Sequence, residues 1–347
     1  MWHNLINVYW KGDMETKLAG RRVLVTGCAG FLGPWVCELL LEKGAQVVGL
    51  DREYKDASRI YEVQRRYPSL KLVNIDIEHY DALFKTIKDE GIEVIFHLAA
   101  QAIVGVANEN PVPTFASNIM GTWNLMESVR LLQNQGAKIE AVVVASSDKA
   151  YGDQEVLPYL EDAPMQGRFP YDVSKSCADL ISRSYFHSYC LPIAVTRCGN
   201  LYGGGDLNFS RIVPGTIKAV LAGEAPLIRS DGSPVRDYIF VKDAARANIA
   251  IAERLLHDKS IAGMAFNISN DAPVSVLQIV EAILQTLKRQ DLKPVVLNQA
   301  SREIQAQYLS SARMRQVLGW APEYSLEQGL AEAANWYGAH LAKVAAK

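Results

Sequence analysis

Three glycines, Gly27, Gly30 and Gly33, constrain the fold of this chain more than any other feature of its sequence. They follow the apolar, β-branched run Arg22–Thr26, which is typical of a buried parallel strand, and they precede helical spacing over Trp35–Glu42. Glycine lets the backbone turn tightly and approach a pyrophosphate, whose charge the N-terminus of the next helix favours. A glycine triplet alone is weak evidence, but its place between a strand and a helix indicates a dinucleotide-binding turn rather than an ordinary turn of small residues.

The glycine turn begins a regular alternation of predicted strands and helices. Further strands are predicted over Gln46–Leu50, Leu70–Ile75, Val94–Leu98, Ala141–Ala145 and Ile193–Arg197, and helices over Tyr80–Glu90, Thr114–Asn134 and Asp179–Tyr189. This alternation predicts an α/β fold in which a doubly wound, Rossmann-type parallel sheet is covered by helices on both faces.

The length of 347 residues exceeds one ordinary domain of about 150 residues. After Asn200 the predicted elements become shorter and less regular, beginning with the glycine-rich stretch Leu201–Ser210. We therefore expect an N-terminal extension over residues 1–20, a dinucleotide-binding domain over 21–200 and a smaller C-terminal α/β substrate lobe over 201–347. Segments of that lobe, either Val235–Val241 or Met264–Ile268, are expected to return to the first sheet.

Composition excludes several classes of function. A net charge of −2 argues against a nucleic-acid partner, and no apolar run reaches the roughly 18 residues of a membrane span. The first 20 residues lack a basic start followed by an apolar block, so they are not a secretory signal. Five scattered cysteines without a CxxC pair indicate reduced thiols in the cytoplasm, and no metal site is predicted because His79, His187 and His257 have no partners at ligand spacing.

Asp51 suggests which dinucleotide the turn binds. It ends the second predicted strand, where a carboxylate accepts hydrogen bonds from both ribose hydroxyls of NAD and repels a 2′-phosphate. Arg52 beside it can bind that phosphate, so NADP is the less favoured alternative. Asp76 and Ile77, after the third strand, are placed to flank the adenine, although Asp76 can equally cap the helix that follows.

Tyr171 and Lys175 form a Tyr-x-x-x-Lys pair near the start of a predicted helix. A spacing of four residues places both side chains on one helical face. A phenol with a pKa of about 10 is a poor base at neutral pH. A lysine ammonium together with an oxidised nicotinamide stabilises the phenolate, and the pair then serves oxidation of an alcohol.

Ser147, Asp148 and Lys149 follow the end of the fifth predicted strand. The carboxyl ends of parallel strands are where ligands collect in such sheets. A serine there can hydrogen-bond a substrate oxygen, and the acid and amine after it form a possible acid/base pair. The alternative is an exposed salt bridge of little consequence. Opposite a redox tyrosine we favour the acid/base pair.

Together these motifs resemble the extended short-chain dehydrogenase/reductase family. TGxxGxxG stands at Thr26–Gly33, the acidic residue of the second strand is Asp51, HLAA stands at His97–Ala100, and Tyr171 begins the Tyr-x-x-x-Lys pair. The likeness spans about Arg22 to Leu330.

Within that family the chain looks most like the nucleotide-sugar 4,6-dehydratases, which carry a hydroxyl residue and two acid/base residues where Ser147 begins its triplet. Asp148-Lys149 and the HLAAQ sequence at His97–Gln101 resemble the CDP-glucose branch. Asp-Lys also occurs in 5-inverting UDP-N-acetylglucosamine dehydratases, and the glycine turn departs from the CDP-glucose pattern at Cys28-Ala29 and Leu32. The resemblance therefore leaves the nucleotide and the sugar open.

The resemblance implies roles for further residues. Cofactor contacts are carried over to Phe31, Leu32, Leu98, Ala99, Ala100 and Asn118. Contacts to a nucleotide-diphosphate sugar are carried over to Gln101, Asn200, Arg211, Arg229, Arg236, Asn267 and Tyr308, with Arg236 the expected phosphate ligand. It also implies a homodimer formed by the helix over Thr114–Asn134 and the one that begins at Tyr171.

The chemistry implied is oxidation at C4 by Tyr171 and NAD, loss of water across C5 and C6, and return of hydride to C6. Asp148 suits the acid for the leaving hydroxyl. Lys149 is either the C5 base, which requires a neutral amine, or a charged stabiliser of the enolate. The alternatives are a nucleotide-sugar 4-epimerase, which needs Ser147, Tyr171 and Lys175 but no Asp-Lys pair, and a noncatalytic NAD-binding regulatory protein.

Overall fold

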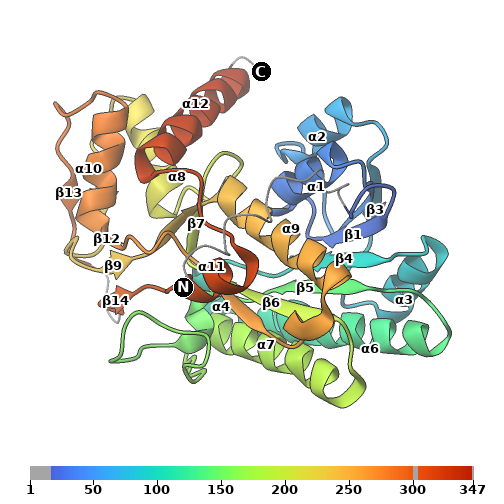
Figure 1. The fold of residues 1–347 in the computed structure, drawn as a ribbon. Helices are drawn as coiled ribbons and strands as arrows, with labels where there is room; N and C mark the ends of the chain where they lie inside the picture. The colour runs from blue at the N-terminus through green and yellow to red at the C-terminus, as the bar shows by residue number, and fades with distance from the viewer. Residues whose placement is uncertain (1–16, 300–303, 346–347) are drawn as a thin grey trace, which may run out of the picture.

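A seven-stranded, wholly parallel sheet forms the centre of the molecule, in the order β11-β6-β5-β4-β1-β2-β3 (Figure 1). This computed structural model describes residues 17–299 and 304–345, so most of the predicted N-terminal extension lies outside the described residues. The strands are β1 (Arg22–Thr26), β2 (Gln46–Asp51), β3 (Lys71–Asn74), β4 (Val94–His97), β5 (Ala141–Ala145), β6 (Ile193–Cys198) and β11 (Ala265–Ile268).

Helices cover both faces of the sheet. One face packs against α1 (Gly33–Glu42), α2 (Ile60–Arg66) and α9 (Val241–His257), and the other against α3 (Tyr80–Asp89), α6 (Gly121–Asn134) and α7 (Pro170–Tyr189). Along β1, Val23 and Val25 belong to the first core and Leu24 to the second. Strands buried on both faces read as continuous apolar runs, and the predicted doubly wound fold is confirmed.

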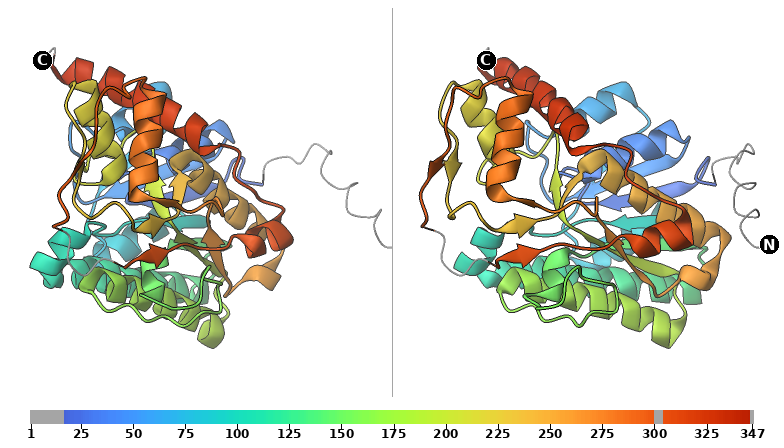
Figure 2. Two further views of the ribbon diagram at one scale, coloured as in Figure 1. Left: turned by 90° about the vertical axis from the view of Figure 1, so that its left-hand side faces the viewer. Right: turned by 60° about the vertical axis from the view of Figure 1, so that its left-hand side comes forward.

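A smaller lobe lies to one side of the sheet (Figure 2). Its own core is enclosed by α8 (Ile212–Leu221), α10 (Val276–Thr286) and α12 (Leu326–Ala345). Three small sheets accompany these helices: β7 (Asn200–Tyr202) with β10 (Tyr238–Phe240), β8 (Leu227–Ile228) with β13 (Val295–Val296), and β9 (Val235–Arg236) between β12 (Val274–Ser275) and β14 (Ala306–Gln307).

The chain crosses between the two parts more than once. Of the two segments expected to return to the first sheet, Met264–Ile268 does so as β11, which pairs with β6. Val235–Val241 does not, because β9 pairs with β12 and β14 while β10 pairs with β7. Helix α9 then packs beneath the first sheet.

None of the helices within residues 17–299 and 304–345 is long and apolar enough to cross a membrane.

Candidate active site

The glycine turn is wound too tightly for side chains. Gly27 has φ +72°, and a Cβ atom there would lie 2.7 Å from the backbone nitrogen of Ala99. A Cβ atom on Gly33 would lie 2.2 Å from the carbonyl oxygen of Gly27. The backbone N–H of Ala29, inside the turn, donates to Asp51 Oδ2 at 3.0 Å. The turn, the loop after β4 and the end of β2 thus meet at the N-terminus of α1, as a bound pyrophosphate requires.

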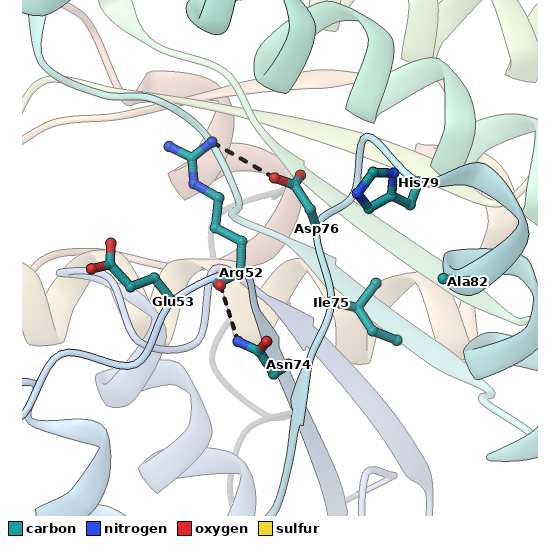
Figure 3. A pocket seen from close by; sticks show the side chains of 7 residues that line it. All are labelled: Arg52, Glu53, Asn74, Ile75, Asp76, His79 and Ala82. Atoms are coloured by element: carbon teal, nitrogen blue, oxygen red, sulfur yellow. Dashed lines mark hydrogen bonds and ion pairs between the residues drawn. The ribbon is translucent and has the colours of Figure 1, made fainter.

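Arg52, the residue after Asp51, lines a cavity of about 670 Å³ (Figure 3). Arg52 forms long ion pairs across it with Asp76 and Glu78, both at 3.8 Å. With its charge already opposed by two carboxylates, Arg52 is poorly placed to attract a 2′-phosphate, which favours NAD. The residues that line the cavity are Arg52, Glu53, Asn74, Ile75, Asp76, His79 and Ala82.

The two residues predicted to flank the adenine are placed differently from each other. Asp76 lines the cavity, and its Oδ1 accepts from the backbone N–H of Glu78 at 3.0 Å rather than capping α3. Ile77 is buried in the sheet–helix core against Gly121, where an added Cβ would lie 2.4 Å from its Cδ1. Ile75 lines the cavity instead of Ile77.

Tyr171 and Lys175 lie one turn apart at the start of α7, and both are buried. Burial raises the pKa of Tyr171 to about 12, while the nearby Arg211 lowers it and Asp148 raises it. Burial lowers the pKa of Lys175 to about 8, and its Nζ donates to the carbonyl oxygen of Ala145 at 2.8 Å. A positive nicotinamide near the phenol would favour its ionised form.

The pair Asp148–Lys149 is not an exposed salt bridge. The Asp148 side chain is 3% exposed and the Lys149 side chain 20%, and Nζ lies 3.1 Å from Asp148 Oδ2. The Ser147 hydroxyl donates to Asp148 Oδ1 at 2.8 Å, so the acid is held from both sides. Ser147 also precedes a 3-10 helix, Asp148–Tyr151, which turns these side chains toward α7.

Two further polar residues enter this cluster that the sequence analysis did not identify. Asp172 is buried next to Tyr171, and burial raises its pKa to about 6 while Lys149 lowers it. Its position inside the Tyr-x-x-x-Lys pair is a signal that could have found it. Gln307 on β14 accepts a hydrogen bond from Lys149 Nζ. No local signal marks Gln307, because it lies in the other part of the chain.

Asn118 lies in a π-helical segment, Ala116–Met120, that interrupts the single helix predicted over Thr114–Asn134. Such segments often occur at functional sites because they redirect one side chain. The Asn118 amide accepts from the backbone N–H of Gln101 at 2.7 Å and donates to the Ser174 hydroxyl at 2.9 Å. It therefore ties the loop after β4 to the helix that carries Tyr171. The short helices α4 (Val104–Glu109) and α5 (Pro111–Phe115) precede it.

The predicted arginines differ in their surroundings. Arg211 donates to Asp206 Oδ2 at 3.0 Å and to the carbonyl oxygen of Ala102 at 3.2 Å. It lies near enough to Tyr171 to lower the pKa of that phenol. Arg236 is half-buried on β9. Arg229 is exposed after β8, and Asn200 opens β7.

Two predicted substrate residues, Asn267 and Gln101, use their side chains within the protein, and a third, Tyr308, bonds through its backbone. Both ends of the Asn267 amide are engaged: Oδ1 accepts from the Tyr151 hydroxyl at 2.7 Å and Nδ2 donates to the Tyr159 carbonyl at 2.9 Å. The Gln101 side chain donates to Thr114 Oγ1 at 3.0 Å, shaping its own loop. The Tyr308 carbonyl pairs with Tyr159, and its neighbour Gln307 reaches Lys149.

The chain is similar to known proteins over most of its length. A family model described as GDP-mannose 4,6 dehydratase matches residues 24–333. The chain belongs to this family. It is 31% identical over 335 residues to a CDP-glucose 4,6-dehydratase of Salmonella typhimurium, covering 92% of this chain and 91% of that one. It is 33% identical over 326 residues to a UDP-glucuronate 4-epimerase of Thermodesulfobacterium geofontis, covering 90% and 95%.

Solved structures of this family include both activities. A dTDP-glucose 4,6-dehydratase of Bacillus anthracis in complex with NAD superposes with a TM-score of 0.78 at 26% identity, covering 92% of this chain and 97% of that one. A UDP-glucose 4-epimerase of Thermotoga maritima with UDP-glucose gives 0.83 at 26% identity, covering 92% and 99%. The resemblance to the extended short-chain dehydrogenases is confirmed, and the chain is an enzyme of the NAD-dependent nucleotide-sugar dehydratase and epimerase family.

Proposed function

We propose that the protein is a nucleotide-sugar 4,6-dehydratase that forms a 4-keto-6-deoxy sugar nucleotide, with CDP-glucose the favoured substrate. The observation that carries the proposal is the ion pair between the buried Asp148 and the partly buried Lys149, close to Tyr171. Oxidation and re-reduction at C4 need neither group, whereas loss of water across C5 and C6 needs an acid and help with a proton. The sequence match to a CDP-glucose 4,6-dehydratase supports the choice of sugar.

The residues of the glycine turn, Asp51 and the loop at Leu98–Ala100 hold NAD in this proposal. Bound NAD supplies the hydride acceptor at C4 and later the hydride donor at C6. The Tyr171 phenolate removes the C4 hydroxyl proton, and the buried Lys175 ammonium favours that phenolate. In this proposal the Ser147 hydroxyl, which donates to Asp148 Oδ1 in the structure, donates instead to the C4 oxygen of bound substrate.

Elimination is assigned to the buried pair. Asp148 protonates the departing C6 hydroxyl, which requires the carboxyl to be protonated at that stage. Lys149 Nζ lies 3.1 Å from Asp148 Oδ2 and assists removal of the C5 proton. It acts either as the amine that accepts this proton or as the ammonium that stabilises the enolate while another group accepts the proton. Arg236 and Arg211 bind the diphosphate, since arginine offers two parallel donors to phosphate oxygens.

The second candidate is a nucleotide-sugar 4-epimerase, favoured by the sequence match to a UDP-glucuronate 4-epimerase. An epimerase would use Ser147, Tyr171 and Lys175 and leave the Asp148–Lys149 pair without a chemical role.

One experiment separates these functions. The purified protein is incubated in deuterium oxide with CDP-, UDP-, GDP- and dTDP-sugars, and products are analysed by mass spectrometry. A dehydratase gives a 4-keto product that has lost one water and carries deuterium at C5. Product of unchanged mass without label at C5 would establish the epimerase and overturn the dehydratase. Absence of turnover with every sugar would support a noncatalytic NAD-binding protein.

We also propose a homodimer formed through α6 and α7. These helices lie side by side on the outer face of the sheet (Figure 1), and their outward sides expose large apolar side chains. Trp123 is 45% exposed, Leu180 54% and Tyr189 53%. Exposed apolar area on two adjacent helices is typical of an interface between copies of a chain.

A further inference from the structure

The side chain of Gln307 has no role in the proposed chemistry, although it touches the acid/base pair. It is fully buried on β14, in the lobe, and accepts a hydrogen bond from Lys149 Nζ. The contact involves the side chains of Gln307, Lys149 and Asp148. Lys149 Nζ therefore has two acceptors, Asp148 Oδ2 on its own 3-10 helix and Gln307 Oε1 from the other part of the molecule.

The orientation of the Gln307 amide is determined by its other contacts. Nε2 points toward the carbonyl oxygens of Asp148 at 3.5 Å and Gly152 at 3.4 Å. Carbonyl oxygens only accept hydrogen bonds, so the amide nitrogen must face them and the amide oxygen must face Lys149. A buried amide with both ends engaged has little freedom to rotate, and the amine is held in one place.

We infer that Gln307 is a positioning residue that holds Lys149 against Asp148 for the elimination step. The inference rests on the proposed dehydratase function. A neutral amide suits this task because it accepts from Lys149 without adding a negative charge. Gln307 also pairs in register with Arg236 on β9, so one small sheet carries both the proposed diphosphate ligand and the residue that holds Lys149.

Lys149 has charged neighbours as well as Gln307. Asp148 lies on the same 3-10 helix, Asp172 faces Lys149 from α7, and Arg236 lies on the strand next to Gln307. Gln307→Glu keeps an oxygen acceptor for Lys149 Nζ but replaces the amide nitrogen that faces the carbonyl oxygens of Asp148 and Gly152. Gln307→Leu removes the acceptor and the donor together, so the two variants separate the loss of the contact to Lys149 from the loss of the contacts to the carbonyls.

The test follows both half-reactions with CDP-glucose as substrate. Stopped-flow absorbance reports reduction of the nicotinamide, and quenched-flow mass spectrometry reports the product that has lost water. Gln307→Leu should slow water loss by about 10- to 100-fold, on the scale of misplacing a reacting group by 1 Å, and leave nicotinamide reduction unchanged. Gln307→Glu, which retains an acceptor for Lys149, should catalyse water loss faster than Gln307→Leu and also leave nicotinamide reduction unchanged.

Gln305→Leu is the matched control, because Gln305 is exposed next to the same strand and bonds Ser233 rather than Lys149. If Gln307→Leu does not fold, the near-isosteric Gln307→Glu variant decides. Wild-type rates of water loss in Gln307→Leu, or equal losses of both half-reactions in Gln307→Glu, would overturn the inference while wild-type dehydration stands. Absence of dehydration in the wild-type protein would instead overturn the proposed function.

Discussion

The Asp51 carboxylate accepts a hydrogen bond from the backbone N–H of Ala29 at 3.0 Å, which joins the end of β2 to the glycine turn. One oxygen thus organises the turn, and burial, the main influence on the group, raises its pKa. The same carboxylate stands where the ribose hydroxyls of NAD would bind. The Asp51 carboxylate therefore both organises the glycine turn and lies where the ribose would bind.

Asp51→Ala should weaken NAD binding by about 10- to 100-fold, the scale of losing hydrogen bonds to a charged group, and weaken NADP binding much less. Titration of the cofactor-free protein by calorimetry measures both affinities. Asp56→Ala, an exposed acid five residues away, is the control and should bind NAD normally. A preference of the unmutated protein for NADP would contradict the assignment and make Arg52 the discriminating residue.

Tyr171→Phe should reduce turnover by at least about 100-fold, because it removes the proton acceptor for the C4 hydroxyl. Cofactor affinity should stay near wild type, since the change deletes one buried oxygen. Activity of the unmutated protein should rise with pH, because burial raises the pKa of Tyr171 to about 12 and only its ionised form accepts the proton. Wild-type-like turnover in the variant would remove Tyr171 from the mechanism.

Lys149→Met keeps the side-chain length and removes the amine. The first half-reaction should persist, so absorbance at about 340 nm from reduced nicotinamide should rise and remain after substrate is added. Product lacking one water should fall by about 100-fold or more. Lys138→Met, at an exposed position, serves as the control. Unimpaired dehydration would contradict a role for Lys149, and C4 inversion that survives would favour the epimerase.

His97 should make the protein sensitive to acid. Burial lowers its pKa to about 3, and its ring nitrogens lie 2.9 Å from Thr26 Oγ1 and 3.2 Å from Thr122 Oγ1. The unfolded chain binds a proton near the ordinary pKa of about 6.5 and the folded chain does not, so stability falls as pH falls below that value.

From pH 7 to pH 5 this linkage removes about 2 kcal/mol of the free energy of unfolding. Urea unfolding across this range should show a shallower pH dependence in His97→Gln than in the wild type. His187→Gln, at an exposed position, should retain the wild-type dependence. Equal slopes in wild type and His97→Gln would show that the ring is not held neutral.

Trp123→Asp combined with Leu180→Asp should convert the proposed dimer to a monomer, because both residues expose large apolar surface on α6 and α7. Sedimentation velocity at micromolar concentration measures the change. Val344→Asp, at an equally exposed apolar position on α12, should leave the assembly unchanged. A monomeric wild-type protein would contradict the prediction.

Local sequence patterns predicted the first sheet well. The strands at Arg22–Thr26 and Ala141–Ala145 were predicted with the bounds they have, and the bounds of the others differ by one residue at either end. Parallel strands buried on both faces produce continuous β-branched runs. An α-helix brings residues four positions apart onto one face, so Tyr171 lies near Lys175 whatever surrounds them. The π-helical segment at Ala116–Met120 escaped prediction, because its helical periodicity is nearly that of an α-helix.

The sequence by itself determined the doubly wound sheet, the glycine turn and the Tyr171–Lys175 pair, since each depends on residues close together in the chain. Only the tertiary structure decided that the Asn267 side chain bonds Tyr151 and Tyr159, and that Gln307 contacts Lys149. Those contacts join residues more than 100 positions apart. Long-range hydrogen bonds leave no periodic trace in a sequence, because the partner of a buried polar group is set by how the elements pack.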